Sequence, residues 1–111
     1  MRKDDSQNLK INSAMREDFL EICKKTGIKE SKAIEKFISY TIEKDGFDID
    51  LSNYKKIISV KTDTRICYRI DSERKEKFKS ICEINNIPVS GAVKLFMDDV
   101  IKEKSMGKYF N

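Results

Sequence analysis

Two short stretches of the chain alternate apolar and polar side chains, in residues 6–11 and 65–70. Alternation with a period of two predicts a strand that buries one face and exposes the other. The second stretch has the stronger pattern, because all three of its inward positions are apolar or aromatic. The inward positions are Gln7, Leu9 and Ile11 in the first stretch and Ile66, Tyr68 and Ile70 in the second. The outward positions are Ser6, Asn8 and Lys10 in the first and Arg65, Cys67 and Arg69 in the second.

Helical spacing follows each predicted strand. Asn12 and Asp71 come directly after the predicted strands, where we expect the N-cap of a helix. Apolar residues then recur three and four apart in residues 15–23 and 78–82. Gly27 and Asn86 come next, and glycine and asparagine are the residues that most readily adopt the left-handed conformation that ends a helix. We therefore expect a first helix to stop at these two positions.

The two halves of the chain are copies of one another. Residues 11–42 align without a gap on residues 70–101 at an offset of 59, and eleven of the 32 positions are identical. Eight of the eleven are apolar, which indicates a shared core. A second helix is predicted to start near Ser31 in one copy and in residues 88–90 of the other, where Pro88 suits a first helical position. Each copy is expected to fold as strand, helix, helix.

Composition limits the chemistry. The 111 residues carry a net charge of +4, are 39% hydrophobic and 38% charged, and suit a small, mainly helical protein. The absence of histidine excludes a Ser-His-Asp triad and a histidine-ligated metal. No glycine-rich phosphate loop or nucleophile–base pair is present, so we expect no catalytic activity, no cofactor and no metal.

Cysteine usage and hydropathy bear on location. Cys23, Cys67 and Cys82 form no C-x-x-C pair, which favours a reducing, cytoplasmic setting. We expect Cys23 and Cys82 to be small core residues and Cys67 to be a small contact residue on its strand. No apolar run reaches the length needed to span a bilayer, and the polar start is unlike a signal peptide. We therefore expect no membrane association.

A strand-helix-helix unit of this size cannot close a core alone and must pair with another copy. Residues 64–101 resemble a ribbon-helix-helix DNA-binding unit of the MetJ/Arc superfamily, and the first copy is similar but more diverged. The resemblance implies a mainly α fold with a two-stranded antiparallel β-ribbon, as a tandem ribbon-helix-helix with a pseudo-two-fold within one chain. The expected segments are a first repeat in residues 6–44, a linker in 45–63 and a second repeat in 64–104, with both repeats in one compact domain.

The resemblance also implies where DNA would bind, because the family places its ribbon in the major groove. The base-reading residues would be Ser6, Asn8, Lys10, Arg65, Cys67 and Arg69. The family anchors DNA phosphate on the N-terminus of the second helix, where free N–H groups favour an anion. That site maps to Lys29, Ser31 and Lys32 in the first copy and to Val89, Ser90 and Gly91 in the second.

The function implied is sequence-specific binding of double-stranded DNA, as a transcriptional repressor or as an accessory factor at a plasmid transfer origin. The tandem build is similar to the accessory DNA-binding proteins of conjugative plasmids. The alternative is an antitoxin that neutralises a toxin and regulates its own operon, although few residues follow the last predicted helix. The linker is apolar enough either to pack on the core or to dock a protein partner. Two such units could occupy neighbouring sites on DNA.

Overall fold

The computed structural model describes residues 4–110 and is mainly helical, with a two-stranded antiparallel sheet. These features were expected from the sequence. No helix among the described residues is long and apolar enough to cross a membrane. The elements in chain order are β1 (Asp4–Ile11), α1 (Ser13–Thr26), α2 (Glu30–Lys44), the 3₁₀ turn η1 (Leu51–Asn53), α3 (Tyr54–Ile58), β2 (Thr64–Asp71), α4 (Ser72–Ile84), α5 (Val89–Glu103) and α6 (Gly107–Phe110).

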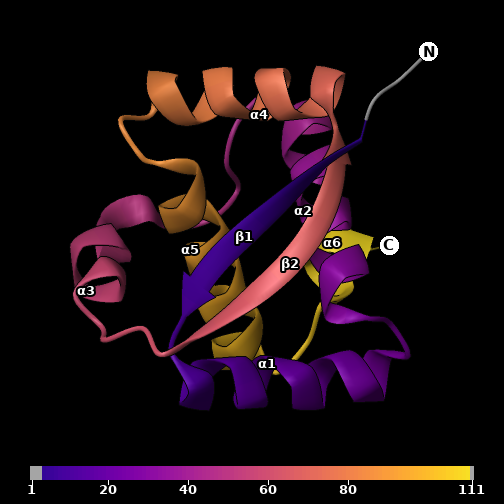
Figure 1. Cartoon of the computed structure of the whole chain (residues 1–111), viewed down its shortest axis with the longest axis vertical. Helices are drawn as coiled ribbons and strands as arrows, with labels where there is room; N and C mark the ends of the chain where they lie inside the picture. Colours follow the sequence, from indigo (N-terminus) through magenta and orange to yellow (C-terminus); the bar gives the residue numbers. More distant parts are fainter. Residues whose placement is uncertain (1–3, 111) are drawn as a thin grey trace.

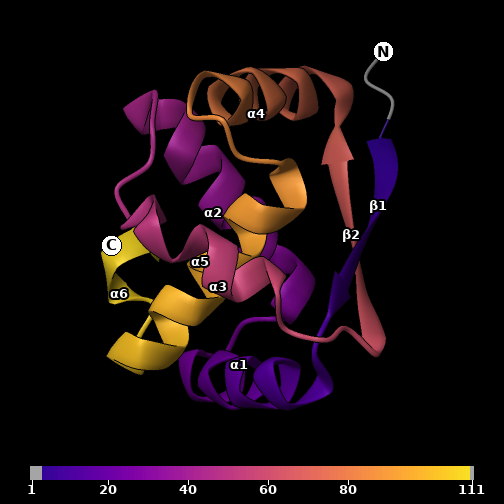
Figure 2. The same ribbon diagram turned by 90° about the vertical axis from the view of Figure 1, so that its left-hand side faces the viewer.

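The two strands form a ribbon that covers one side of the helices (Figure 2). Helices α2 and α5 lie behind the ribbon, while α1 and α4 lie at opposite ends of the molecule (Figure 1). The paired strands place Asn8 opposite Cys67, with Ser6 opposite Arg69 and Lys10 opposite Arg65. The strand around Asn8 therefore pairs antiparallel with the strand around Cys67 within one chain, as the length of the connection allowed.

The first helices begin and end where local signals predicted. The side chains of Asn12 and Asp71 accept hydrogen bonds from backbone N–H groups three residues later and so cap α1 and α4. Gly27 and Asn86 both have positive φ, at 78° and 55°. Gly27 is the C-cap of α1, as predicted, whereas the C-cap of α4 is Asn85 and the left-handed residue Asn86 follows it.

The second helices begin at or close to the predicted positions. Helix α2 starts at Glu30, one residue before Ser31, with Lys29 as its N-cap. Pro88 is the N-cap of α5 and not its first helical residue, because its ψ of 154° is still extended. Its carbonyl already accepts the first helical hydrogen bond, from the N–H of Ala92 at 3.0 Å.

A cluster of buried phenylalanines forms the centre of the core. Phe37 and Phe96, from α2 and α5, stack with ring centroids 4.4 Å apart and an interplanar angle of 12°. Phe19 meets Phe96 edge-on at 5.8 Å, and Phe78 meets Phe37 edge-on at the same distance. All four side chains are almost inaccessible to water, so this cluster joins α1 to α5 and α4 to α2.

The linker packs on this core. Five of its apolar residues are half-buried against the cluster, which agrees with a packed element, whereas Val60 is exposed. These linker residues are Phe47, Ile49, Leu51, Tyr54 and Ile57. After α5 the chain turns back through α6; Met106 is buried in the core, and Tyr109 meets Phe37 and Phe96 edge-on.

Candidate nucleic-acid interface

The outer face of the ribbon carries the six residues that the strand pattern placed outward. All six are exposed, whereas Leu9, Ile66 and Tyr68 on the inner face are buried. The outward residues are Ser6, Asn8, Lys10, Arg65, Cys67 and Arg69. Three of the six are cationic, and neither residues 6–11 nor residues 64–70 include an acid. The outer ribbon face is therefore polar and positively charged.

A sulfur–amide hydrogen bond lies at the middle of this face. The Cys67 thiol donates to Oδ1 of Asn8 at 2.8 Å. A carbonyl oxygen has two lone pairs, so Oδ1 can still accept a second hydrogen bond while Nδ2 donates. The contact orients the Asn8 amide and gives Cys67 a definite neighbour.

The first turn of α2 lies beside the ribbon on the β2 side. A surface hollow of about 410 Å³ is lined by residues of both elements. They are Ser6, Cys67, Tyr68 and Arg69 from the ribbon and Ser31, Lys32 and Glu35 from α2. The structure thus brings two of the predicted phosphate-binding residues, Ser31 and Lys32, next to three of the predicted base-reading residues.

A second hollow, of about 390 Å³, continues from the first and shares Ser31 and Cys67 with it. Lys29, the third predicted phosphate-binding residue of this copy, lines it together with Lys24 of α1. Leu20, Cys23 and Ile28 add apolar surface. We call these two adjoining hollows the groove; three lysines line it, Lys24, Lys29 and Lys32, together with Glu30 and Glu35. Sequence reasoning missed Lys24, although it lies one helical turn after Leu20 on the same face of α1.

Carboxylates are also present at the start of α2, and no motif in the sequence indicated a role for them. Glu30, the first helical residue, accepts two hydrogen bonds from the Arg16 guanidinium, at 2.7 and 3.2 Å. This contact raises the pKa of Arg16 above its usual value. Lys32 lies 3.9 Å from Glu35. Arg16 therefore compensates the negative charge of Glu30, while the side chains of Lys29 and Lys32 remain exposed.

The first turn of α5 differs from that of α2. Ser90 is exposed and Val89 half-buried, but Gly91 is buried against the ring of Tyr54 from α3. A Cβ at Gly91 would lie 2.7 Å from Cε1 of Tyr54, closer than real carbon contacts. The three predicted phosphate-binding residues of the second copy therefore lie in one helical turn but differ in exposure.

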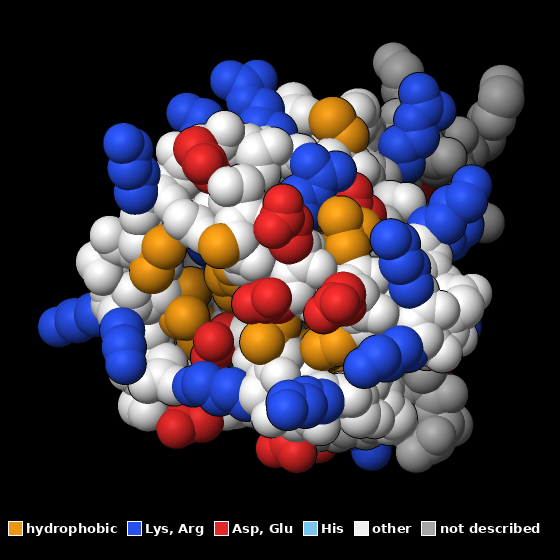
Figure 3. All heavy atoms as spheres, turned by 90° about the horizontal axis from the view of Figure 1, so that it is seen from below, with side chains coloured by type: hydrophobic (Ala, Val, Ile, Leu, Met, Phe, Trp, Pro, Cys, Tyr) orange, Lys and Arg blue, Asp and Glu red, His pale blue; other side chains and the backbone are white. Residues whose placement is uncertain are grey.

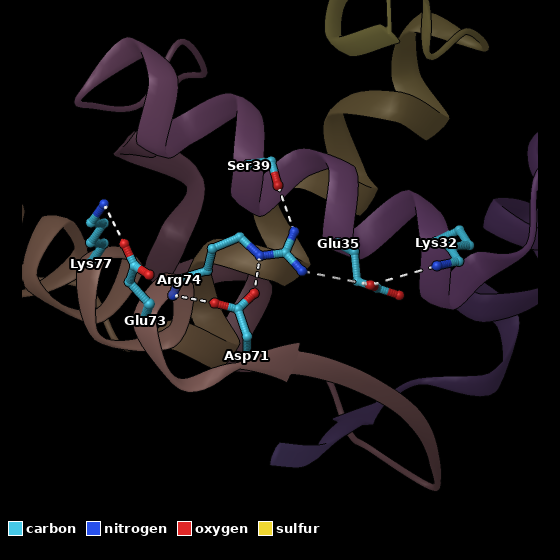
Figure 4. A network of polar contacts seen from close by, with 7 residues as sticks. All are labelled: Lys32, Glu35, Ser39, Asp71, Glu73, Arg74 and Lys77. Atoms are coloured by element: carbon cyan, nitrogen blue, oxygen red, sulfur yellow. Dashed lines mark hydrogen bonds and ion pairs between the residues drawn. The ribbon is translucent and has the colours of Figure 1, made fainter. Parts of the chain in front are cut away.

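A polar network ties the groove to the far end of β2 (Figure 4). Asp71 ends β2 and caps α4 by accepting from the Arg74 N–H at 3.1 Å, and it also pairs with the Arg74 guanidinium. Arg74 holds the pKa of Asp71 below its usual value. The same guanidinium donates to Oγ of Ser39 at 2.8 Å and lies 4.0 Å from Glu35. Arg74 thus fixes α2, and with it the carboxylate that pairs with Lys32, relative to the ribbon.

Acidic side chains gather elsewhere on the surface. Glu17, Asp18 and Glu21 of α1 are exposed, and Figure 3 shows acidic groups in the middle of the end of the molecule seen from below, with lysines and arginines around them. The ribbon strands have no acid within residues 6–11 and 64–70. Residues 6–11 and 64–70 of the ribbon are therefore the more positive surface, although β1 begins with two aspartates and α1 also has exposed Lys24 and Lys25.

Two cysteines are buried and one is exposed, as expected. Burial raises the pKa of Cys23 to about 11 and that of Cys82 to about 12. Among the described residues no cluster of histidine, cysteine or acidic side chains could hold a metal ion.

Comparison with known proteins gives no relative: no family model, no curated protein and no solved structure matches the chain.

Proposed function

We propose that the chain is a sequence-specific double-stranded DNA-binding protein that reads bases with the β1–β2 ribbon. The observation that carries the proposal is the groove in which the exposed, cationic ribbon face meets the first turn of α2. A two-stranded ribbon fits the major groove of DNA, and alternate side chains then reach base edges. A helix N-terminus beside it suits a backbone phosphate.

Internal equivalence supports a tandem ribbon-helix-helix arrangement with a pseudo-two-fold axis. Asn8 and Cys67 pair across the ribbon and occupy the same position of the sequence repeat. Phe37 and Phe96 are also equivalent and stack on each other. An axis that passes between the members of both pairs would relate residues 6–44 to residues 64–104, with 45–63 as the connection. In this arrangement the two copies complete a single core.

The reading residues differ between the two strands, so the preferred site should not be a palindrome. Arg65 and Arg69 have the guanidinium fork that pairs with guanine, and Lys10 also suits guanine. Asn8 suits adenine, and the Cys67 thiol would hold its amide in position for a bidentate contact. Ser6 completes the set. Lys29, Ser31 and Lys32 would bind phosphate on the α2 side.

On the α5 side, Ser90 and the backbone N–H groups of Val89 and Gly91 would serve the same purpose. The biological role is that of a transcriptional repressor or of an accessory factor at a plasmid transfer origin, since both use the same binding chemistry. An antitoxin role needs a segment free to wrap a toxin. The packing of the apolar linker residues on the core argues against the linker as that segment.

Selection of binding sites from random duplexes tests this proposal. We expect enrichment of one site with two unlike halves, protected on the major-groove edge of its central bases. The position of matching sites in the source genome, at promoters or at a transfer origin, would then separate the two roles. A pool that shows no enrichment over scrambled duplexes would contradict the proposal.

A further inference from the structure

Helix α3 occupies a place that a lysine has in the other half of the molecule. Gly91 corresponds in the repeat to Lys32, and the ring of Tyr54 lies where a side chain at position 91 would be. Pro88 likewise corresponds to Lys29. The first turn of α5 therefore lacks both lysines that the first turn of α2 has, and α3 covers part of it (Figure 2).

Helix α3, which packs on this turn through Tyr54, has two lysines of its own. Lys55 and Lys56 directly follow Tyr54, both are exposed, and α3 contains no acid. In Figure 1 the helix lies to the side of the ribbon, next to α5. The first turn of α5 thus lacks two lysines that α2 has, and α3, which packs against that turn, has two.

The acids of the linker have contacts away from the first turn of α5: Asp45 caps the end of α2, and Asp63 accepts hydrogen bonds from Ser13 of α1. Asp50 lines a hollow of about 190 Å³ with Asp98 and Asp99, further along α5 than Gly91. Asp48 accepts a hydrogen bond from the Tyr40 hydroxyl at 2.8 Å. Two of the three linker lysines therefore lie in α3, which contacts the first turn of α5 through Tyr54, whereas Asp50 lies beside the later turns of α5 together with Lys102.

We propose that Lys55 and Lys56 of α3 bind backbone phosphates of DNA on the α5 side of the ribbon. This inference rests on the proposed DNA-binding function and extends the bound surface to a segment outside both repeats. Exposed lysines recognise phosphate as point charges and carry no base information, so they would add affinity and salt dependence without changing site preference. DNA would then be held by lysines on both flanks, from α2 on one side and from the inserted helix on the other.

The test compares the double variant Lys55→Ala/Lys56→Ala with the wild type on the selected duplex and on a scrambled duplex over a range of salt concentrations. Two lost phosphate contacts should lower the slope of log affinity against log salt by about 1.8. Between roughly 50 and 200 mM salt, the wild type should lose about tenfold more affinity than the variant. Site preference should not change, and Lys55→Arg/Lys56→Arg should keep the wild-type slope.

Two controls make the result specific. Lys44→Ala/Lys102→Ala removes lysines from the C-terminal turns of α2 and α5 and should leave the slope unchanged. Trimming the selected duplex on the flank bound by α3 should abolish the difference in salt slope between the wild type and the α3 variant. Trimming the flank bound by α2 should preserve that difference. The inference is wrong if the α3 variant keeps the wild-type slope on a duplex that the wild type binds specifically. If the wild type binds no duplex, the proposed function itself fails.

Discussion

The substitution Gly91→Ala measures how firmly α3 is held on the first turn of α5. The added carbon would lie 2.7 Å from Cε1 and 3.0 Å from Cδ1 of Tyr54. Favourable carbon contacts are about 3.5–4.0 Å, so the ring must move away by about 1 Å. Such overpacking costs about 1–3 kcal/mol, while alanine regains up to about 1 kcal/mol over glycine in a helix. We expect the free energy of unfolding to fall by up to about 2 kcal/mol.

Removing the ring should reverse the sign of this effect. In a Tyr54→Ala background the methyl group of Gly91→Ala meets no ring, so the helical preference of alanine should stabilise the protein by up to about 1 kcal/mol. Chemical denaturation of the wild type, both single variants and the double variant gives the coupling energy, expected at about 1–3 kcal/mol. Equal effects of Gly91→Ala in the two backgrounds would refute the placement of Tyr54 over α5.

Four further predictions concern the core, the groove and the thiols. Phe37→Ala should lower the free energy of unfolding by about 3–5 kcal/mol, because its ring is buried at the centre of the aromatic cluster; thermal or chemical denaturation checks this. Lys29→Ala should weaken binding to all duplexes about equally and lower the salt slope by about one, which titrations at several salt concentrations would reveal. Cys67 should react first with a thiol reagent near neutral pH, because Cys23 and Cys82 are buried and have raised pKa values. Burial raises the pKa of Cys23 in the folded protein to about 11, so above pH 9 the unfolded chain loses this proton before the folded protein does. The free energy of unfolding should therefore fall between about pH 9 and pH 11, and Cys23→Ala should reduce the fall in melting temperature over that range.

The elements that the sequence predicted well depend on local signals. Alternation in residues 65–70 determined which side of β2 would be buried, because side chains alternate between the two faces of a strand and a one-residue shift would move all of them to the other face. Asn12 and Asp71 cap their helices through contacts within three residues, Gly27 ends α1 through its own backbone angles, and Asn86 takes the left-handed conformation directly after the C-cap of α4. Such features need no knowledge of the rest of the fold. The site predictions on the ribbon followed from the same alternation and from the family resemblance.

The features that the sequence did not predict depend on contacts between distant segments. Tyr54 and Gly91 are in different elements, and neither residue alone indicates a close approach. The pair of Arg16 with Glu30 and the contact of Arg74 with α2 likewise need the packed helices. A charged sequence offers many partners for each arginine, so spacing alone does not select one. These contacts decide how much of the positive charge beside the ribbon is neutralised.

Binding of ribbon variants to specific and scrambled duplexes tests the central claim most directly. Arg65→Ala and Arg69→Ala should each lower affinity for the selected site by about 1–3 kcal/mol, or about 5- to 150-fold, and relax the preference at one base position. Affinity for the scrambled duplex should change much less, and Ser90→Ala should cost less than either arginine variant. The account is contradicted if Asn8, Lys10, Arg65 and Arg69 can all be replaced by alanine without a change in site preference.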